Sequence, residues 1–182
     1  MQILSEWMYR KSTTWVALIS VILFLAFSAL VLPGQSAAAE SYSAGTGSPD
    51  TSLFYSSDDL YRMAEIYGSE GRQAYIRARF TFDLAFPLIY GLFLTACVSW
   101  LLNRSMPEGN PWRPLNLAPL AGVLFDFLEN ISTALVIGRY PSVTPVFAAL
   151  APAFTLIKWI FVGGSFGLLF LGIILVFCSS NK

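Results

Sequence analysis

Four long apolar segments divide the chain. The first reads TWVALISVILFLAFSALVL over residues 14–32 and contains no charged residue. Three further apolar segments cover residues 80–103, 115–137 and 145–178. A helix rises about 1.5 Å per residue, so each segment is long enough to cross a hydrocarbon core about 30 Å thick. The pattern predicts four membrane-spanning helices.

A loop over residues 33–79 joins the first two spans. Residues 35–57 are rich in Ser, Ala, Gly and Thr, which indicates a flexible, solvated linker. Residues 58–67 carry their apolar side chains on one helical face: Leu60, Met63, Ala64 and Tyr67. With Ser57 as the N-cap, they predict a short amphipathic helix. We expect it to rest on the bilayer surface or over the mouth of the bundle.

Two of the spans contain prolines that bear on helix continuity. Ser69 is expected to begin a long helix that continues into the second span, where Pro87 would kink it. The last apolar segment, residues 145–178, is too long for one straight span. Either Pro152 separates a short outer helix from it, or the whole segment is tilted.

The predicted fold class is an all-α integral membrane protein, a four-transmembrane-helix antiparallel bundle forming one membrane domain over residues 1–182. Only helices or closed barrels cross a bilayer, because every backbone polar group there needs a partner within the protein. Long apolar runs without alternation exclude a transmembrane barrel.

The first span has a rival interpretation as a cleaved signal peptide. The stretch QSAAAES at residues 35–41 supplies small residues at which a peptidase could cut. The uncharged run is longer than the 7–15 residues usual for the apolar part of a signal peptide. The uncleaved span is therefore the favoured interpretation.

Orientation rests on the flanks of the first span. If the N-terminus is inside, the basic residues outside the apolar cores divide evenly: Arg10, Lys11, Arg104, Arg113 and Lys182 inside, and Arg62, Arg72, Arg77, Arg79 and Arg139 outside. The first span, which usually dominates, has its basic residues at its N-terminal end. Trp15, Trp100 and Trp112 would then lie together near the inner interface. We expect both termini to be cytoplasmic, in the cell membrane.

Composition removes several classes of function. Only 12% of residues are charged, mean hydropathy is +0.61 and the formal net charge is zero. Nucleic-acid binding has no electrostatic support. The chain lacks histidine, and its two cysteines, Cys97 and Cys178, are far apart, which excludes CxxC motifs and a disulfide framework. No cofactor is predicted.

The informative residues are the charges inside the spans. Each costs about 2.5–3.5 kcal/mol at bilayer depth, so such residues face protein or water and have partners. On the helix that leads into and forms the second span, one stripe at helical spacing holds Arg79, Asp83, Pro87 and Tyr90. The third span has another: Gly122, Asp126, Glu129, Asn130 and Thr133. Both stripes should face the interior of the bundle.

Counting residues from the outer ends of the spans gives the depth of each side chain. Tyr90 comes level with Asp126, and Asp83 lies near Asn130 and Thr133. Lys158 in the last span comes level with Asp126 or Glu129. The expected arrangement is a cation that faces carboxylates in the outer half of the bundle.

Two functions are compatible with this cluster. In the first, the charges are interhelical clamps in a structural protein or accessory subunit. In the second, they line a pocket in a membrane-embedded enzyme or binding protein for a lipid or isoprenoid. Asp126 or Glu129 would then act as general acid or base, Lys158 would orient an anionic group and Tyr90 would donate a hydrogen bond. An open cavity beside Asp126 would favour the second function, and a closed ion pair the first.

Two weaker patterns remain. Asp126-x-x-Glu129-Asn130 lacks the second carboxylate cluster of paired magnesium sites, so no metal site is predicted. Gly163 and Gly167 form a small-xxx-small pattern in the last span that permits close helix contact. It would serve either packing within this chain or a homodimer, besides the contacts with membrane lipids.

Overall fold

The computed structural model describes residues 1–180, and this part of the chain consists of helices joined by loops and turns, without strands. Its elements are α1 Gln2–Lys11, α2 Thr14–Leu30, α3 Leu32–Ser43, the 3-10 helix η1 Pro49–Thr51, α4 Ser57–Ile66, α5 Gly68–Arg79, α6 Phe82–Ser105, the 3-10 helix η2 Arg113–Leu117, α7 Ala118–Arg139 and α8 Pro145–Ser180. Lys182, counted above among the inside charges, lies outside the described residues.

Four helical stretches are long and apolar enough to cross a membrane. They cover Thr14–Ser43, Gly68–Ser105, Arg113–Arg139 and Pro145–Cys178. Each contains one of the four apolar segments found in the sequence. The number and the place of the long apolar helices are therefore as predicted.

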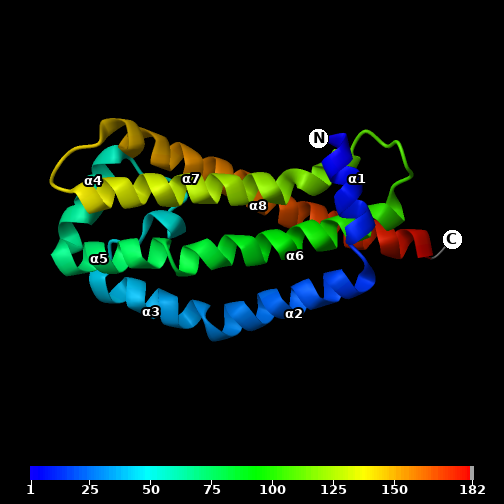
Figure 1. Cartoon of the computed structure of the whole chain (residues 1–182), viewed down its shortest axis with the longest axis horizontal. Coiled ribbons are helices and arrows are strands. Elements are labelled where there is room, and N and C mark those ends of the chain that lie inside the picture. Colours follow the sequence, from blue (N-terminus) through cyan, green and yellow to red (C-terminus); the bar gives the residue numbers. More distant parts are fainter. Residues whose placement is uncertain (181–182) are drawn as a thin grey trace.

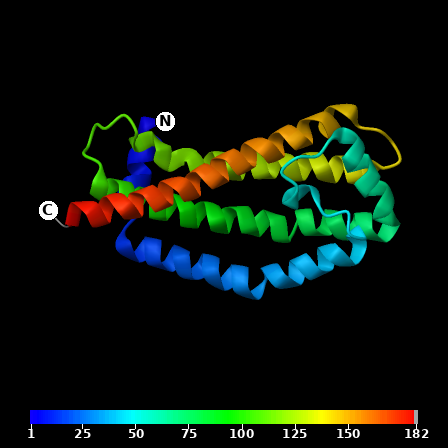
Figure 2. The same ribbon diagram turned by 180° about the vertical axis from the view of Figure 1, so that it is seen from behind.

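The long helices lie side by side in a helical bundle (Figures 1 and 2). α7 packs most extensively on α8, and α6 contacts α2, α7 and α8. α2 packs mainly on α6, at the edge of the bundle. The N-terminus, the connection between α6 and α7, and the end of α8 gather at one end of the bundle, and α4, α5 and the turn between α7 and α8 gather at the other (Figure 1).

Residues 35–43 are helical, so the expectation of a flexible linker over 35–57 is wrong for its first part. α3 begins directly after α2 and runs to Ser43. Pro33 stands in the first turn of α3, where its missing N–H costs nothing and its fixed φ suits a helix. Alanines 37–39, in the middle of α3, have a high helix propensity and favour its continuation.

The amphipathic helix exists as α4 and covers one end of the bundle. Its apolar face, with Leu60, Met63 and Ala64, is buried against α7 and α8. Its N-cap is Ser56 rather than the predicted Ser57: Ser56 Oγ accepts from Asp59 N, and the Asp59 carboxylate accepts from Ser56 N. This capping box decides where the helix begins.

The helix expected to run from Ser69 into the second span is interrupted. α5 ends at Arg79 and α6 begins at Phe82. Thr81 adopts a non-helical conformation, and its hydroxyl donates to Arg77 O at 2.7 Å. Pro87 lies inside α6, beyond the interruption.

α8 is one continuous helix from Pro145 to Ser180, and Pro152 does not divide it. Figure 2 shows it crossing the other long helices obliquely. The structure therefore agrees with one long inclined segment and not with a separate outer helix.

The N-terminal helix α1 has no counterpart in the sequence interpretation. It packs on α6 and η2 at the end of the bundle that also holds the connection to α7 (Figure 1). Tyr9 Oη donates to Arg113 O at 2.7 Å, and Ser5 Oγ donates to Asn116 Oδ1 at 2.7 Å. Buried hydrogen bonds thus hold α1 in place, a signal that hydropathy does not reveal.

Candidate functional site

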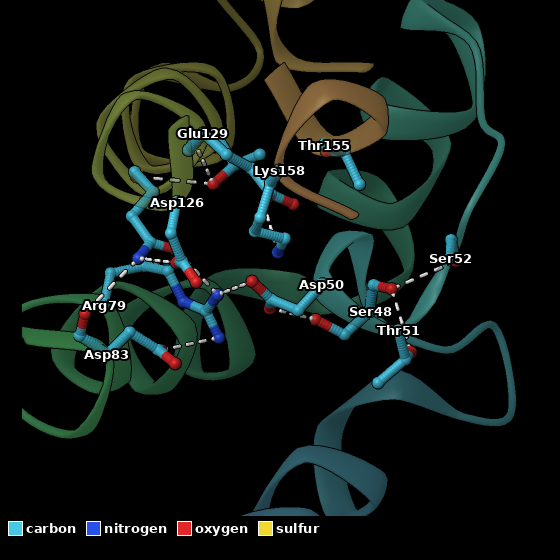
Figure 3. Close-up of polar contacts among 12 residues, drawn as sticks. Ser48, Asp50, Thr51, Ser52, Arg79, Asp83, Asp126, Glu129, Thr155 and Lys158 are labelled. Atoms are coloured by element: carbon cyan, nitrogen blue, oxygen red, sulfur yellow. Dashed lines mark hydrogen bonds and ion pairs between the residues drawn. The ribbon is translucent and has the colours of Figure 1, made fainter. Parts of the chain in front are cut away.

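Arg79 lies at the centre of a buried polar cluster between the helices (Figure 3). It is the last residue of α5, and its guanidinium pairs with Asp50 of η1 and, at 2.8 Å, with Asp83 of α6. Nη1 also donates to Asn130 Oδ1 of α7 at 3.2 Å. Asp83 lies four residues beyond Arg79 on the predicted stripe. Through these contacts, Arg79 connects the end of α5 to η1, α6 and α7.

Asp126 of α7 forms the second part of the cluster. Tyr90 Oη of α6 donates to its Oδ2 at 2.9 Å, and Asn130 Nδ2 donates to its Oδ1 at 2.9 Å. Asn130 Nδ2 also contacts Asp83 O at 3.4 Å. Tyr90 and Asp126 are therefore level, and Asp83 lies beside Asn130, as the count of residues along the spans predicts.

Lys158 of α8 pairs with Glu129 of α7, one of the two partners predicted for it. Glu129 is fully buried and Lys158 is 4% exposed. Tyr55, in the loop before α4, shares a hydrogen bond of 2.9 Å with Thr155 Oγ1, one turn before Lys158. The ion pair is therefore buried in the interface between α7 and α8.

Asp50 is the functional candidate that sequence reasoning missed. Ser48 Oγ donates to its Oδ2 at 2.8 Å, and η1 directs the carboxylate at Arg79. Burial by itself would raise the pKa of Asp50, but the positive charges of Arg79 and Lys158 and the Ser48 hydrogen bond outweigh it and lower that pKa. The only local signal is Ser48-Pro49-Asp50, which suits a tight turn but does not indicate its partner.

A cavity of about 410 Å³ opens beside this cluster. Its polar wall contains Asp50, Arg79, Asp83, Asp126 and Lys158. Its apolar wall contains side chains of α2, α6 and α8, among them Phe24, Phe82, Phe86, Val162 and Phe166. Of the predicted site residues, Asp83, Tyr90, Asp126 and Lys158 line the cavity, whereas Glu129 does not.

Carboxyl groups outnumber cations in this cluster. Four carboxylates (Asp50, Asp83, Asp126 and Glu129) face two cations, Arg79 and Lys158. Arg79 serves two of the carboxylates and Lys158 one. Asp126 receives hydrogen bonds from neutral groups, and no cation of the described residues lies within ion-pair distance of it.

Metal binding has no geometric support in the part of the chain that the structure describes. Within residues 1–180, no three His, Cys, Asp or Glu side chains are grouped so that they could hold an ion.

Gly163 and Gly167 do not line the cavity. A Cβ atom added at either glycine would meet nothing within 4 Å among the described residues. The close contacts of α8 are made elsewhere, since a Cβ at Gly172 would lie 2.9 Å from Leu101 Cβ. The pattern at 163–167 is therefore not used for packing within this chain.

Comparison with protein-family models, curated proteins and solved structures found no match to this chain.

Proposed function

We propose that the chain spans the cell membrane four times as an antiparallel bundle with both termini cytoplasmic. The four helical stretches have the required length and hydropathy. Large apolar side chains on α2 and α8 point away from the protein, including Ile22, Leu25, Ile160 and Phe170, which are 58–67% exposed. Lipid tails would cover such side chains, whereas water would not favour them.

We propose that the protein binds a lipid-like amphiphile in the cavity beside Asp126. The cavity carries this proposal: its volume lies within the range of about 300–1,000 Å³ usual for small-molecule sites. One wall is aromatic and aliphatic, and the other presents charged groups, so a molecule with an apolar tail and a polar head would match both. A purely structural cluster needs no such space.

Asp126 would be the residue that acts on a bound molecule if the protein also catalyses a reaction. Of the two carboxylates considered as general acid or base, Asp126 lines the cavity and Glu129 is sequestered with Lys158. Tyr90, which already donates to Asp126, would adjust its proton affinity.

A structural or accessory role is the second candidate, and the closed pair Lys158–Glu129 favours it. Both side chains are buried and joined between α7 and α8, as an interhelical clamp requires. This role is compatible with the first, because Glu129 lies outside the cavity lining.

The test is native mass spectrometry of the full chain released from a mild detergent. Ala39 of α3 lines the cavity, whereas its neighbour Ala38 is exposed. We expect wild type and Ala38→Phe to retain a co-purified amphiphile at a ratio of one to one, and Ala39→Phe to lose it. An equal adduct in all three proteins, or none in any of them, would refute the binding proposal and leave the structural role.

A further inference from the structure

We infer that the amphiphile bound in this cavity has a cationic amine as its head group, an inference that rests on the binding function proposed above. A long-chain amine matches the cavity better than an alcohol or a fatty acid does. Three independent features support this choice: the charge balance, the aromatic rings beside Asp126, and a pairing within the chain that a bound amine would repeat.

The charge balance is the first feature. Arg79 and Lys158 supply two positive charges to four carboxyl groups, so two negative charges stay uncompensated beside the cavity when all four carboxyl groups are ionised. Asp126 is 9% exposed and Asp83 is 8% exposed, and both line the cavity. Uncompensated buried charge is costly, so a ligand that brings a positive charge is favoured and one that brings a negative charge is opposed.

Spare hydrogen-bonding capacity is part of the same feature. Each oxygen of Asp126 accepts one hydrogen bond, although a carboxylate offers about four lone-pair sites. Asp83 Oδ2 has no hydrogen-bond donor in the described chain beyond its ion pair with Arg79. An ammonium has three N–H donors and no acceptor, which is what two partly used carboxylates need.

The aromatic rings are the second feature. Phe82, Phe86 and Tyr90 form a row along α6, with ring centres 5.3 and 5.7 Å apart, and all three line the cavity. The row ends at the Tyr90 hydroxyl, which donates to Asp126. A cation beside a carboxylate and over aromatic faces gains from both, whereas a neutral or anionic head group does not.

The third feature is that Lys158 already shows this pairing inside the chain. Its ammonium pairs with the Glu129 carboxylate and lies 5.2 Å from the centre of the Trp159 ring. Asp126 with Tyr90 and Phe86 offers the same combination of carboxylate and aromatic rings, without a cation of its own. A ligand amine would pair with Asp126 in the same way that the Lys158 ammonium pairs with Glu129.

The experiment compares three probes of equal chain length: dodecylamine, dodecanol and dodecanoic acid. Each is titrated at neutral pH against the full chain in a non-ionic detergent, and bound protein is counted by native mass spectrometry. We expect dodecylamine to bind about ten- to a hundredfold more tightly than dodecanol, which is the range of a hydrogen bond to a charged group. Dodecanoic acid should bind most weakly.

Variants assign this preference to its residues. Asp126→Asn should bring dodecylamine to the affinity of dodecanol and leave dodecanol unchanged, whereas Tyr90→Phe, which keeps the carboxylate, should retain the preference. Glu108→Gln, which makes the same change of charge at an exposed position in the turn after α6, should behave as wild type. The three probes on wild type alone remain decisive if Asp126→Asn does not fold.

The outcomes separate the two proposals. If the amine and the alcohol bind wild type equally, and Ala39→Phe abolishes both, the cavity binds amphiphiles but the amine inference is wrong. A preference for dodecanoic acid, or an amine preference that survives Asp126→Asn, also overturns it. If none of the probes binds, both proposals fail.

Discussion

Lys158 of α8 and Glu129 of α7 form an ion pair inside the bundle, with 5% and 0% of their side chains exposed. The pair joins the two helices that pack most extensively on each other. Breaking it by removing one partner leaves a buried charge, whereas removing both charges leaves none. This asymmetry gives the first prediction.

Lys158→Met should lower the free energy of unfolding by about 3–5 kcal/mol. Adding Glu129→Gln should recover most of the loss, whereas adding Asp126→Asn should recover little, because Lys158 pairs with Glu129. Unfolding curves in detergent for the single and double variants measure both effects. If Asp126→Asn rescued better than Glu129→Gln, the assignment of the partner would be wrong.

Asp50→Asn should destabilise the protein by about 1.5–3 kcal/mol, because the loop loses a charged hydrogen bond to Arg79. The Arg79 charge helps to lower the pKa of Asp50 below 3.8, so this contribution is complete above pH 3.8 and is lost as pH falls through the lower folded value. The stability difference between wild type and Asp50→Asn, followed from pH 7 downwards, should therefore stay constant until about pH 4. A difference that declines already near pH 6 would contradict the pairing.

Tyr9 should ionise late. Burial raises its pKa from 10.0 to about 12, against the opposing effect of Arg113. The tyrosinate absorbance that Tyr9→Phe removes should therefore appear about two pH units above that of free tyrosine. Because the folded pKa is raised, the stability from Tyr9 is present below pH 10 and declines as pH rises towards 12. If Tyr9→Phe instead removed tyrosinate absorbance that appears near pH 10, α1 would not dock as described.

The proposed topology predicts opposite labelling of the two ends of the bundle. In a background without Cys97 and Cys178, Ser142→Cys should react with a membrane-impermeant thiol reagent on intact cells, and Glu108→Cys only after lysis. The sequon Asn103-Arg104-Ser105 should stay unglycosylated in a eukaryotic host, because it lies on the Glu108 side. The reverse labelling pattern would invert the orientation.

Alanine substitutions at two glycines of α8 should change the stability of the protein in opposite directions. Gly172→Ala places a methyl group 2.9 Å from Leu101 Cβ and should cost about 1–3 kcal/mol by overpacking. Gly167→Ala enters open space and should stabilise the helix by up to about 1 kcal/mol. Thermal unfolding of the two variants compares them directly.

We propose that the open face of α8 at Gly163 and Gly167 forms a homodimer. The dimer fraction can then be measured in addition to the stability. Gly167→Ile should then lower the cross-linked dimer fraction in membranes without lowering the stability of the monomer. An unchanged dimer fraction would refute that interface.

The amino-acid sequence by itself determined the four apolar helices and the inward faces of Asp83, Tyr90, Asp126 and Glu129. Both follow from local rules: an apolar run of fixed rise sets the helix, and the 3.6-residue period sets the face. Counting along two helices even paired Tyr90 with Asp126, because neighbouring helices of similar length keep levels comparable.

The tertiary structure decided what depends on segments distant in sequence. Asp50 reaches Arg79 only because η1 folds back over the bundle, and a Ser/Gly-rich loop has no periodicity from which that path could be read. The choice of Glu129 over Asp126 for Lys158 depends on how α8 is rotated and inclined, which a nearly uniform apolar helix does not encode in its pattern. The cavity also depends on packing, because it is the space that α2, α3, α6 and α8 leave beside the polar side chains of η1, α5 and α7.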